Sequence, residues 1–305
     1  MKGYIKLLVR EGLNELDDFD PFGHSGYEET DDITEEPICV LGMSKANAKL
    51  DWPYMSLPAG YTCPQATICK NFAARTGKKF KGGKSLKSTK DTEFMCYAAR
   101  QQAQYHTTAG KNAFNNLDLL REANKSDGID GMANLIIGSL KYYGFDKVPV
   151  FRIHEGGDFF SNDYMKAWVE VAKSIPGTTF YTHTTSLKFW LNNKSSVPRN
   201  MKLIASLDKN NEDFIMSNNL RYARVVYSVE EAKELRLPID YDDTIACCSD
   251  ENFALLIHGQ QPSGSEASKA MSKNKKEGIY KKMKKMHTAT KDKRSDTLSK
   301  MRKNK

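Results

Sequence analysis

The pattern of apolar and polar positions alternates regularly from about residue 148 onward. Runs rich in β-branched and aromatic residues predict strands, and segments with apolar residues three or four apart predict helices between them. The predicted strands are 148–153, 178–184, 201–206, 222–228 and 243–248. The predicted helices are 161–175, 186–193, 211–219 and 230–235. Such alternation favours βα units built around a parallel sheet.

A further short strand is predicted at 54–57, which brings the number of βα strands to six. Six units favour a parallel (β/α)6 partial TIM-like barrel, a partial barrel rather than a closed eight-fold one. A doubly wound sheet is the alternative. Residues 97–143 have a helical pattern, with breaks near Gly110 and at 126–131.

One strand–turn–helix unit concentrates polar side chains. The buried strand 148–153 is followed by Gly156 and Gly157, and Ser161 is a suitable N-cap for the helix after them. Ligands bind at the carboxyl ends of strands in α/β folds, and four polar residues occur at this end. They are Arg152, His154, Glu155 and Asp158. The alternative is an ordinary turn with a solvated charged loop, in which His154 is a hydrogen-bonded core residue.

The carboxyl ends of the next strands carry further polar residues. His183 follows the second strand of this series, and Ser206 follows the third. If the strands are parallel, these side chains face one cavity together with the residues of the glycine turn. Arg152, His154, Asp158 and His183 are the candidate catalytic residues of this cavity.

Charge is strongly segregated along the chain. Residues 1–40 contain eleven Asp or Glu against three Lys or Arg, and residues 269–305 contain fifteen Lys or Arg against three Asp or Glu. We predict an acidic N-terminal segment at 1–40, an α/β domain at 41–271 and a basic tail, helical or disordered, at 272–305. The tail has enough positive charge to bind nucleic acid phosphates, or it only increases solubility.

No apolar run approaches the roughly 20 residues of a membrane span. The first ten residues do not have the pattern of a signal peptide, so we expect a cytoplasmic protein. Residues 76–92, rich in Lys, Gly, Ser and Thr, predict a flexible basic excursion.

Three of the six cysteines form a candidate metal site with the spacing Cys63-x5-Cys69-x26-Cys96. Three thiolates can bind a [4Fe–4S] cluster and leave one iron open for a ligand. With His154 or His106 as a fourth ligand they would bind zinc instead. The remaining possibility is unpaired structural thiols. Either metal site requires the three sulfurs to converge, with the excursion 76–92 looping out between them.

A hydrolase or nuclease is a further alternative. Asp158, Glu155 and His154 at a strand end would suit a magnesium or manganese ion, since hard oxygen ligands prefer such cations.

Several motifs resemble the phage "gene product 88" family. They are Cys63-Pro, Cys96-Tyr-Ala, Phe151-Arg-Ile-His-x-Gly-Gly-Asp-Phe-Phe-Ser, Phe180-Tyr-Thr-His-Thr-Thr-Ser and Gly259-Gln-Gln-Pro-Ser-Gly-Ser-Glu-Ala. The similarity spans about residues 40–272. It implies a phage origin, and hence the cytoplasm of the infected host, without implying an activity.

The arrangement also resembles radical S-adenosylmethionine enzymes, which have six βα units and three cluster cysteines after the first strand. This resemblance implies a cluster on Cys63, Cys69 and Cys96. It also implies that Gly156, Gly157 and Asp158 hold the amine of S-adenosylmethionine, with Ser206 in the same cavity. The family spacing CxxxCxxC is much tighter than the spacing in this chain.

Overall fold

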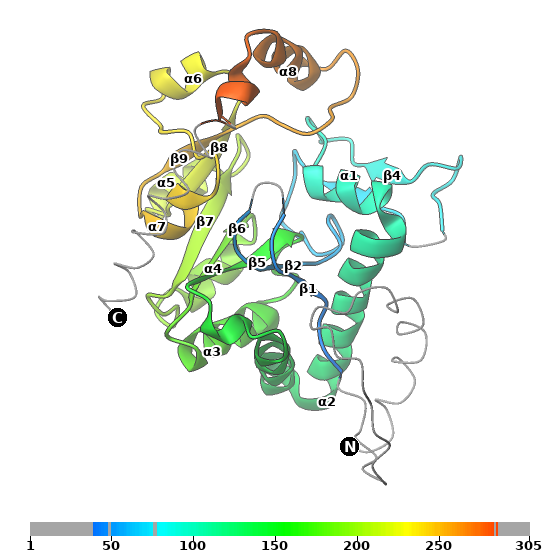
Figure 1. Ribbon diagram of the computed structural model, residues 1–305, viewed down its shortest axis with the longest axis vertical. Helices are drawn as coiled ribbons and strands as arrows, with labels where there is room; N and C mark the ends of the chain where they lie inside the picture. The colour runs from blue at the N-terminus through cyan, green and yellow to red at the C-terminus, as the bar shows by residue number, and fades with distance from the viewer. Residues whose placement is uncertain (1–38, 48–49, 76–77, 284, 286–305) are drawn as a thin grey trace, which may run out of the picture. The chain divides into compact units, whose positions relative to one another are not determined.

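The computed structural model describes residues 39–47, 50–75, 78–283 and 285. The chain divides at Val40 into two units, and every helix and strand given below belongs to the second, Leu41–Lys305 (Figure 1). The predicted acidic segment, up to residue 38, and the end of the predicted basic tail lie outside the described residues.

The second unit is built on a mixed, mostly parallel sheet of seven strands in the order β1-β2-β5-β6-β7-β8-β9. Their bounds are β1 Met43–Ser44, β2 Tyr54–Ser56, β5 Val150–Gly156, β6 Thr179–Thr184, β7 Met201–Leu207, β8 Tyr222–Val226 and β9 Phe253–Leu256. Only β1 is antiparallel to its neighbour. A doubly wound sheet would reverse its strand order at a switch point. The order here never reverses, so that alternative is wrong. The edge strands β1 and β9 do not pair with each other, so no barrel is closed.

Five of the six predicted βα strands are confirmed, as β2, β5, β6, β7 and β8. The prediction of a strand at 243–248 is wrong, because Thr244–Cys248 forms helix α7. Asp243, at φ 62°, turns the chain into this helix. The sixth parallel strand is β9, from the apolar run that begins at Phe253. Periodicity alone does not distinguish a short buried strand from a short buried helix.

The main core lies between the sheet and the helices that cover one face of it. These helices are α2 Lys111–Tyr142, α3 Asn162–Ser174, α4 Leu187–Asn193 and α5 Glu212–Ser217. Trp168 of α3 packs on Phe151 and Phe180, and all three are fully buried. The predicted cap of α3 is confirmed, since Ser161 Oγ accepts the Tyr164 N–H at 3.1 Å. Figure 1 shows α2 and α3 side by side below the sheet.

Both predicted breaks before β5 are confirmed. The π-helical turn His106–Gly110 separates α1, Tyr97–Gln104, from α2. Asp127 and Gly128 have non-helical dihedral angles and kink α2.

The opposite face of the sheet holds a second, smaller core. Helix α7 packs there against β6 and β7. Its Ala246 and Cys247 join an apolar cluster with Trp52, Tyr181 and Ile204. Period-2 alternation along β6 separates the two cores, because Phe180 belongs to the first and Tyr181 to the second.

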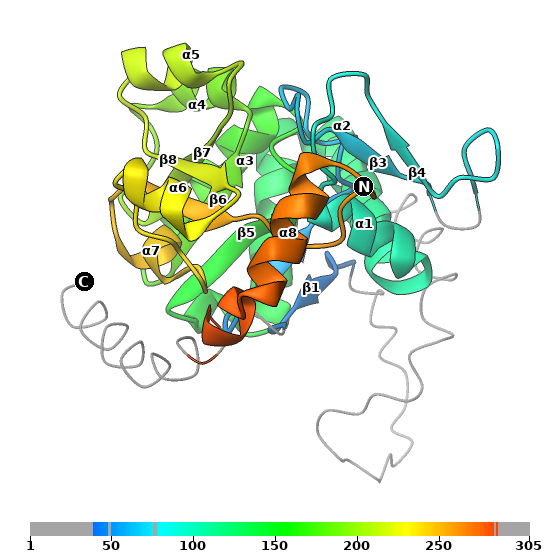
Figure 2. The same ribbon diagram turned by 90° about the horizontal axis from the view of Figure 1, so that it is seen from above.

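The lysine-rich excursion is more regular than predicted. Strands β3, Asn71–Ala73, and β4, Leu86–Ser88, form an antiparallel hairpin in which Asn71 pairs with Ser88. The predicted excursion at 76–92 thus contains β4 and, at its tip, a bridge between Phe80 and Lys84. Figure 2 shows this hairpin extending on the side of α1, away from α4 and α5.

The start of the predicted basic tail is helical and packed against the fold. Helix α8, Glu266–Lys276, crosses the predicted boundary at residue 271. Its buried Asn274 donates to the Tyr227 carbonyl at 2.8 Å, and the Tyr280 hydroxyl donates to the Ile257 carbonyl at 2.6 Å. Near it lies α6, Val229–Glu234 (Figure 1). Among the described residues no helix is long and apolar enough to cross a membrane.

Candidate thiol site at the carboxyl ends of the strands

The loop after β2 crosses the carboxyl ends of the neighbouring parallel strands. The Leu57 N–H donates to the carbonyl of Gly156 at the end of β5, at 2.8 Å. Farther along, Thr67 Oγ1 donates to Asp208 Oδ2, just after β7, at 3.0 Å. The predicted convergence of segments at this edge of the sheet is therefore present, and this loop carries Cys63 and Cys69.

The third cysteine is brought to this loop by the β3–β4 hairpin. Pairing of Asn71 with Ser88 brings the chain back after the excursion. The buried Asn71 side chain then accepts the backbone N–H of Cys96 at 2.7 Å and donates to Ser88 Oγ at 2.9 Å. Cys96 is the N-cap of α1. The hairpin thus returns the chain to the loop that carries Cys69, although Cys69 and Cys96 are far apart in the sequence.

The three thiols lie within electrostatic reach of one another. Burial and then the charges of Asp158, Cys96 and Cys69 raise the pKa of Cys63 well above its usual value. Burial, followed by the charges of Cys96, Asp208 and Asp158, also raises the pKa of Cys69. Burial raises the pKa of Cys96. Each thiolate would thus lie among buried negative charges, an environment that a bound cation stabilises.

Backbone N–H groups partly offset this repulsion. The N–H groups of Ala98 and Ala99 at the start of α1 lower the pKa of Cys96, and the N–H of Gly60 lowers that of Cys63. Such N–H groups stabilise a thiolate, as helix N-termini do in general. The site therefore has backbone donors aimed at the sulfurs of Cys63 and Cys96.

The side chains do not form a site for a single metal ion. Over the described ranges no group of three or more His, Cys, Asp or Glu side chains has such an arrangement. A tetrahedral zinc would need sulfurs roughly 3.8 Å apart, given Zn–S bonds of about 2.3 Å. In a [4Fe–4S] cluster the thiolates bind different irons, so their sulfurs lie farther apart.

Asp158 has no acceptor position left for a ligand. Its Oδ1 accepts the Thr184 hydroxyl at 2.6 Å and the Phe159 N–H at 2.7 Å. Its Oδ2 accepts the Thr185 N–H at 2.7 Å and the Thr185 hydroxyl at 2.8 Å. A carboxylate has about four lone-pair positions, and all four are used. Asp158 therefore joins the loop after β5 to the loop after β6.

The glycine turn is covered by protein atoms. A Cβ on Gly156 would lie 2.9 Å from the Ala98 Cβ of α1. Gly157 has φ +84°, and a Cβ there would lie 2.6 Å from Thr62 Oγ1 and 2.9 Å from the Leu57 carbonyl oxygen. The close approach that these glycines permit is thus made by the loop after β2 and by α1.

His154 lies in the core between the sheet and α3. Tyr54 pairs with Arg152 and Ser56 pairs with Gly156. Between these two pairs β2 advances by two residues and β5 by four, so β5 contains a bulge. This β-bulge changes the direction of the side chains after Arg152. As a result, His154 Nε2 bonds the Tyr164 hydroxyl at 3.1 Å and Nδ1 bonds Thr182 Oγ1 at 3.3 Å. Burial and the charge of Arg152 lower the pKa of His154 to about 3, so the ring is neutral. We had expected His154 and Asp158 to open onto one cavity, but both side chains are almost fully buried.

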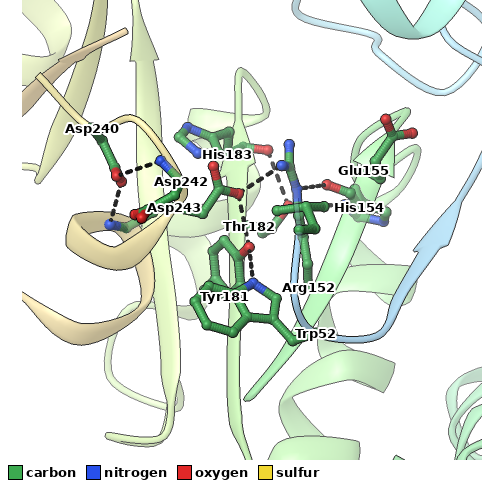
Figure 3. Close-up of polar contacts among 12 residues, drawn as sticks. Trp52, Arg152, His154, Glu155, Tyr181, Thr182, His183, Asp240, Asp242 and Asp243 are labelled. Atoms are coloured by element: carbon green, nitrogen blue, oxygen red, sulfur yellow. Dashed lines mark hydrogen bonds and ion pairs between the residues drawn. The ribbon is translucent and has the colours of Figure 1, made fainter. Parts of the chain in front are cut away.

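Arg152 is the centre of a buried polar network on the α7 side of the sheet (Figure 3). It donates to Asp243 Oδ2 at 2.7 Å, to the Tyr97 hydroxyl at 2.8 Å and to the His154 carbonyl at 2.8 Å. The Tyr181 hydroxyl donates to the same Asp243 oxygen at 2.8 Å and accepts from Trp52 Nε1 at 2.7 Å. Tyr97 directly follows Cys96, so this network also holds the start of α1 in place.

Two predicted site residues keep an unpaired polar atom. His183 Nδ1 is buried with no hydrogen-bond partner in the described part of the chain, and burial lowers the pKa of His183 to about 4. Its ring contacts Phe253. The partly buried Ser206 side chain also has no hydrogen bond to a described residue.

Sequence reasoning missed the residues that hold the site together. Asp243 follows a run of polar residues, but its partner Arg152 is 91 positions away. No sequence signal indicated that Asn71 positions Cys96. For Tyr97, the one available signal was its place next to a candidate ligand cysteine.

Comparison with known proteins establishes the family. The model of the family described as "Gene product 88" matches residues 33–281. This chain belongs to the gene product 88 family. The match covers every helix and strand described above, from β1 to α8.

Two curated members of the gene product 88 family are mycobacteriophage proteins. The "Gene 88 protein" of Mycobacterium phage D29 is 25% identical over 185 residues, which cover 59% of this chain and 68% of the relative. The "Gene 88 protein" of Mycobacterium phage L5 is 27% identical over 162 residues, which cover 52% of this chain and 58% of the relative. No solved structure matches. The comparisons give no support to the resemblance to radical S-adenosylmethionine enzymes.

Proposed function

We propose that this gene product 88 protein binds an iron–sulfur cluster of the [4Fe–4S] type through Cys63, Cys69 and Cys96. The observation that carries the proposal is the mutual placement of the three thiols. The loop after β2 and the β3–β4 hairpin bring them within electrostatic reach at the carboxyl ends of parallel strands. When bound, such a cluster supplies one-electron redox chemistry and an open iron for a ligand.

The electrostatics of the site support a cluster. Backbone N–H groups of Ala98 and Ala99 are aimed at Cys96, and hydrogen bonds to cysteine sulfur are one means by which proteins tune such clusters. The order of the six parallel strands supports a partial TIM-like barrel around the site. A protein of this kind would act in the cytoplasm of the infected host.

The proposal does not include S-adenosylmethionine. The residues that would hold its amine are engaged in the fold, because Asp158 has four donors and Gly157 is packed against Leu57 and Thr62. A divalent-metal hydrolase is not favoured either, since it would use Asp158 together with His154, whose ring nitrogens both have partners.

Anaerobic purification and cluster reconstitution test the proposal. We expect about four irons and four sulfides per chain and the visible absorption of a cluster. A Cys63→Ala, Cys69→Ala, Cys96→Ala variant should lose the iron. Cys248→Ala is the matched control, because Cys248 is a partly buried cysteine on α7 and lies outside the proposed ligand set.

Two results would overturn the proposal. One is iron content in the reconstituted protein no higher than in the triple variant. The other is stoichiometric zinc that the triple variant also loses, which would assign the thiols to a single-ion site instead.

A further inference from the structure

The β3–β4 hairpin carries an unpaired basic surface. Its described segment 78–90 contains six lysines and no acidic residue. All six are exposed, namely Lys78, Lys79, Lys81, Lys84, Lys87 and Lys90. Within the described ranges, none of these six side chains takes part in an ion pair or a hydrogen bond.

Lysines on the helices are arranged differently. Lys125, Lys166 and Lys173 each lie within 4 Å of an acidic residue three positions earlier in the helix, as Lys269 does on α8. These lysines have the short-range pairing that is usual on solvated helix surfaces. The hairpin therefore differs from the helices in its lack of acidic partners as well as in its lysine content.

Backbone hydrogen bonds hold the tip of the hairpin. At its tip the Phe80 N–H donates to the Lys84 carbonyl and the Gly83 N–H donates to the Phe80 carbonyl, at 2.9 and 3.0 Å. Gly82 and Gly83, at φ +80° and +72°, permit this tight turn. An ordered basic hairpin loses less conformational entropy on binding a polyanion than a flexible segment would.

We propose that the β3–β4 hairpin binds the phosphate backbone of duplex nucleic acid without reading its sequence. A two-stranded ribbon fits the major groove, and lysines neutralise phosphates as point charges. Segment 78–90 contains no Arg, Asn or Gln, the side chains that form bidentate contacts with bases. An anionic membrane is a poorer partner, because no large apolar side chain of the hairpin is exposed for insertion.

The test measures the salt dependence of binding to a duplex DNA of mixed sequence. In the full-length chain, Lys79, Lys81 and Lys84 are replaced by Gln. Each lost phosphate contact removes about 0.9 from the slope of log Kobs against log salt. We therefore expect the slope to become shallower by about 3 and affinity at low salt to fall at least about tenfold.

A second triple variant, with Lys125, Lys166 and Lys173 replaced by Gln, is the matched control. It has the same net charge and retains the hairpin, so its slope should equal that of the unchanged chain. The predicted tail is present in every variant, and its contribution therefore cancels. Thermal melting should be similar for both variants, because all six substituted lysines are exposed.

Three outcomes would overturn the proposal. The slope of the hairpin variant could be unchanged, both triple variants could lose affinity equally, or the chain could bind anionic vesicles and not DNA. The inference does not depend on the proposed cluster, since loss of iron in the cysteine variants should leave the salt slope unchanged.

Discussion

Two neighbouring regions at the carboxyl ends of the strands use their polar groups in opposite ways. In the Asp158 turn, residues 156–158, one carboxylate accepts four hydrogen bonds and the glycines are covered by protein. In the thiol site, the partly buried residues Cys63, Cys69 and Cys96 lie near other acidic groups, and burial together with these groups raises the pKa of Cys63 and Cys69. Both regions looked like ligand sites in the sequence.

The difference shows which polar residues at strand ends are available for chemistry. A buried polar group whose hydrogen bonds are all made within the chain stabilises the fold. A polar group whose hydrogen-bonding capacity is not filled within the chain is a better candidate for binding something else. By this criterion Asp158 and His154 are structural, and the three thiols remain candidates for function.

The largest expected effect is that of Asp158→Ala. The substitution leaves four donors near the end of β6 without their acceptor, and the free energy of unfolding should fall by about 4 kcal/mol. Chemical denaturation measures this change. Asp91→Ala, at an exposed position, is the control and should change stability by less than about 0.5 kcal/mol. A loss below about 1 kcal/mol for Asp158→Ala would contradict the structural role.

Arg152 and Asp243 are expected to form a second structural pair. Their side chains are 11% and 16% exposed, and removing one partner should cost about 3 kcal/mol because it leaves a buried charge. A double-mutant cycle with Arg152→Met and Asp243→Asn should give a coupling of at least about 1.5 kcal/mol.

The more exposed pair Arg224–Glu212, with side chains 35% and 43% exposed, provides the control cycle. Its coupling should lie below about 1 kcal/mol. Additive effects of Arg152→Met and Asp243→Asn would show that the ion pair does not hold the network together.

The glycine turn can be tested with a single methyl group. Gly157→Ala should destabilise the protein by about 3 kcal/mol, because φ is positive and the new Cβ would meet Leu57 and Thr62. Gly177→Ala meets no atom within 4 Å and should change the unfolding free energy by less than about 1 kcal/mol. A well-tolerated Gly157→Ala would mean that the turn is open and able to accept a ligand.

His154 should make stability depend on pH. Its pKa in the folded protein, about 3, lies below the ordinary value of 6.5. Between these values the unfolded chain binds a proton that the folded chain does not, so stability is present above pH 6.5 and falls as pH decreases. The expected slope is about 1.4 kcal/mol per pH unit.

Chemical denaturation of His154→Gln at several pH values tests this prediction. The unfolding free energy of the variant should depend less on pH between about 3 and 6.5 than that of the unchanged protein. Tyr164→Phe is the control, since it removes one hydrogen bond of the ring but keeps the histidine buried. It should lower stability by a similar amount at each pH. An unchanged slope in His154→Gln would mean that the imidazole is not held neutral by burial.

The smallest expected effect is that of Cys63→Ser in metal-free protein. The thiol has little favourable interaction with the chain, so the unfolding free energy should change by less than about 1 kcal/mol. Together with a large loss for Asp158→Ala, this small change would show that the Asp158 turn stabilises the fold and that the Cys63 thiol does not. A loss as large as that of Asp158→Ala would make Cys63 a structural residue.

Local patterns predicted much of the fold. Apolar alternation located β2 and β5 to β8, and the helical period with Ser161 located α3. These predictions succeeded because a strand or helix of several residues must bury one periodic face. The segment at 243–248 failed because a short run of four apolar residues fits either a strand or a helix.

The sequence by itself determined the strand–helix alternation, the meeting of the loops at one edge of the sheet and the cysteines available there. Only the tertiary structure decided which polar residues were already used. The bulge in β5 turned His154 toward Tyr164, the two threonines after β6 occupied Asp158, and the β3–β4 hairpin brought Cys96 to Cys69. Tyr164 is 10 positions from His154, and Thr185 is 27 positions from Asp158. Local periodicity carries no information about such partners, because hydrogen bonding is decided by which atoms meet after the chain has folded.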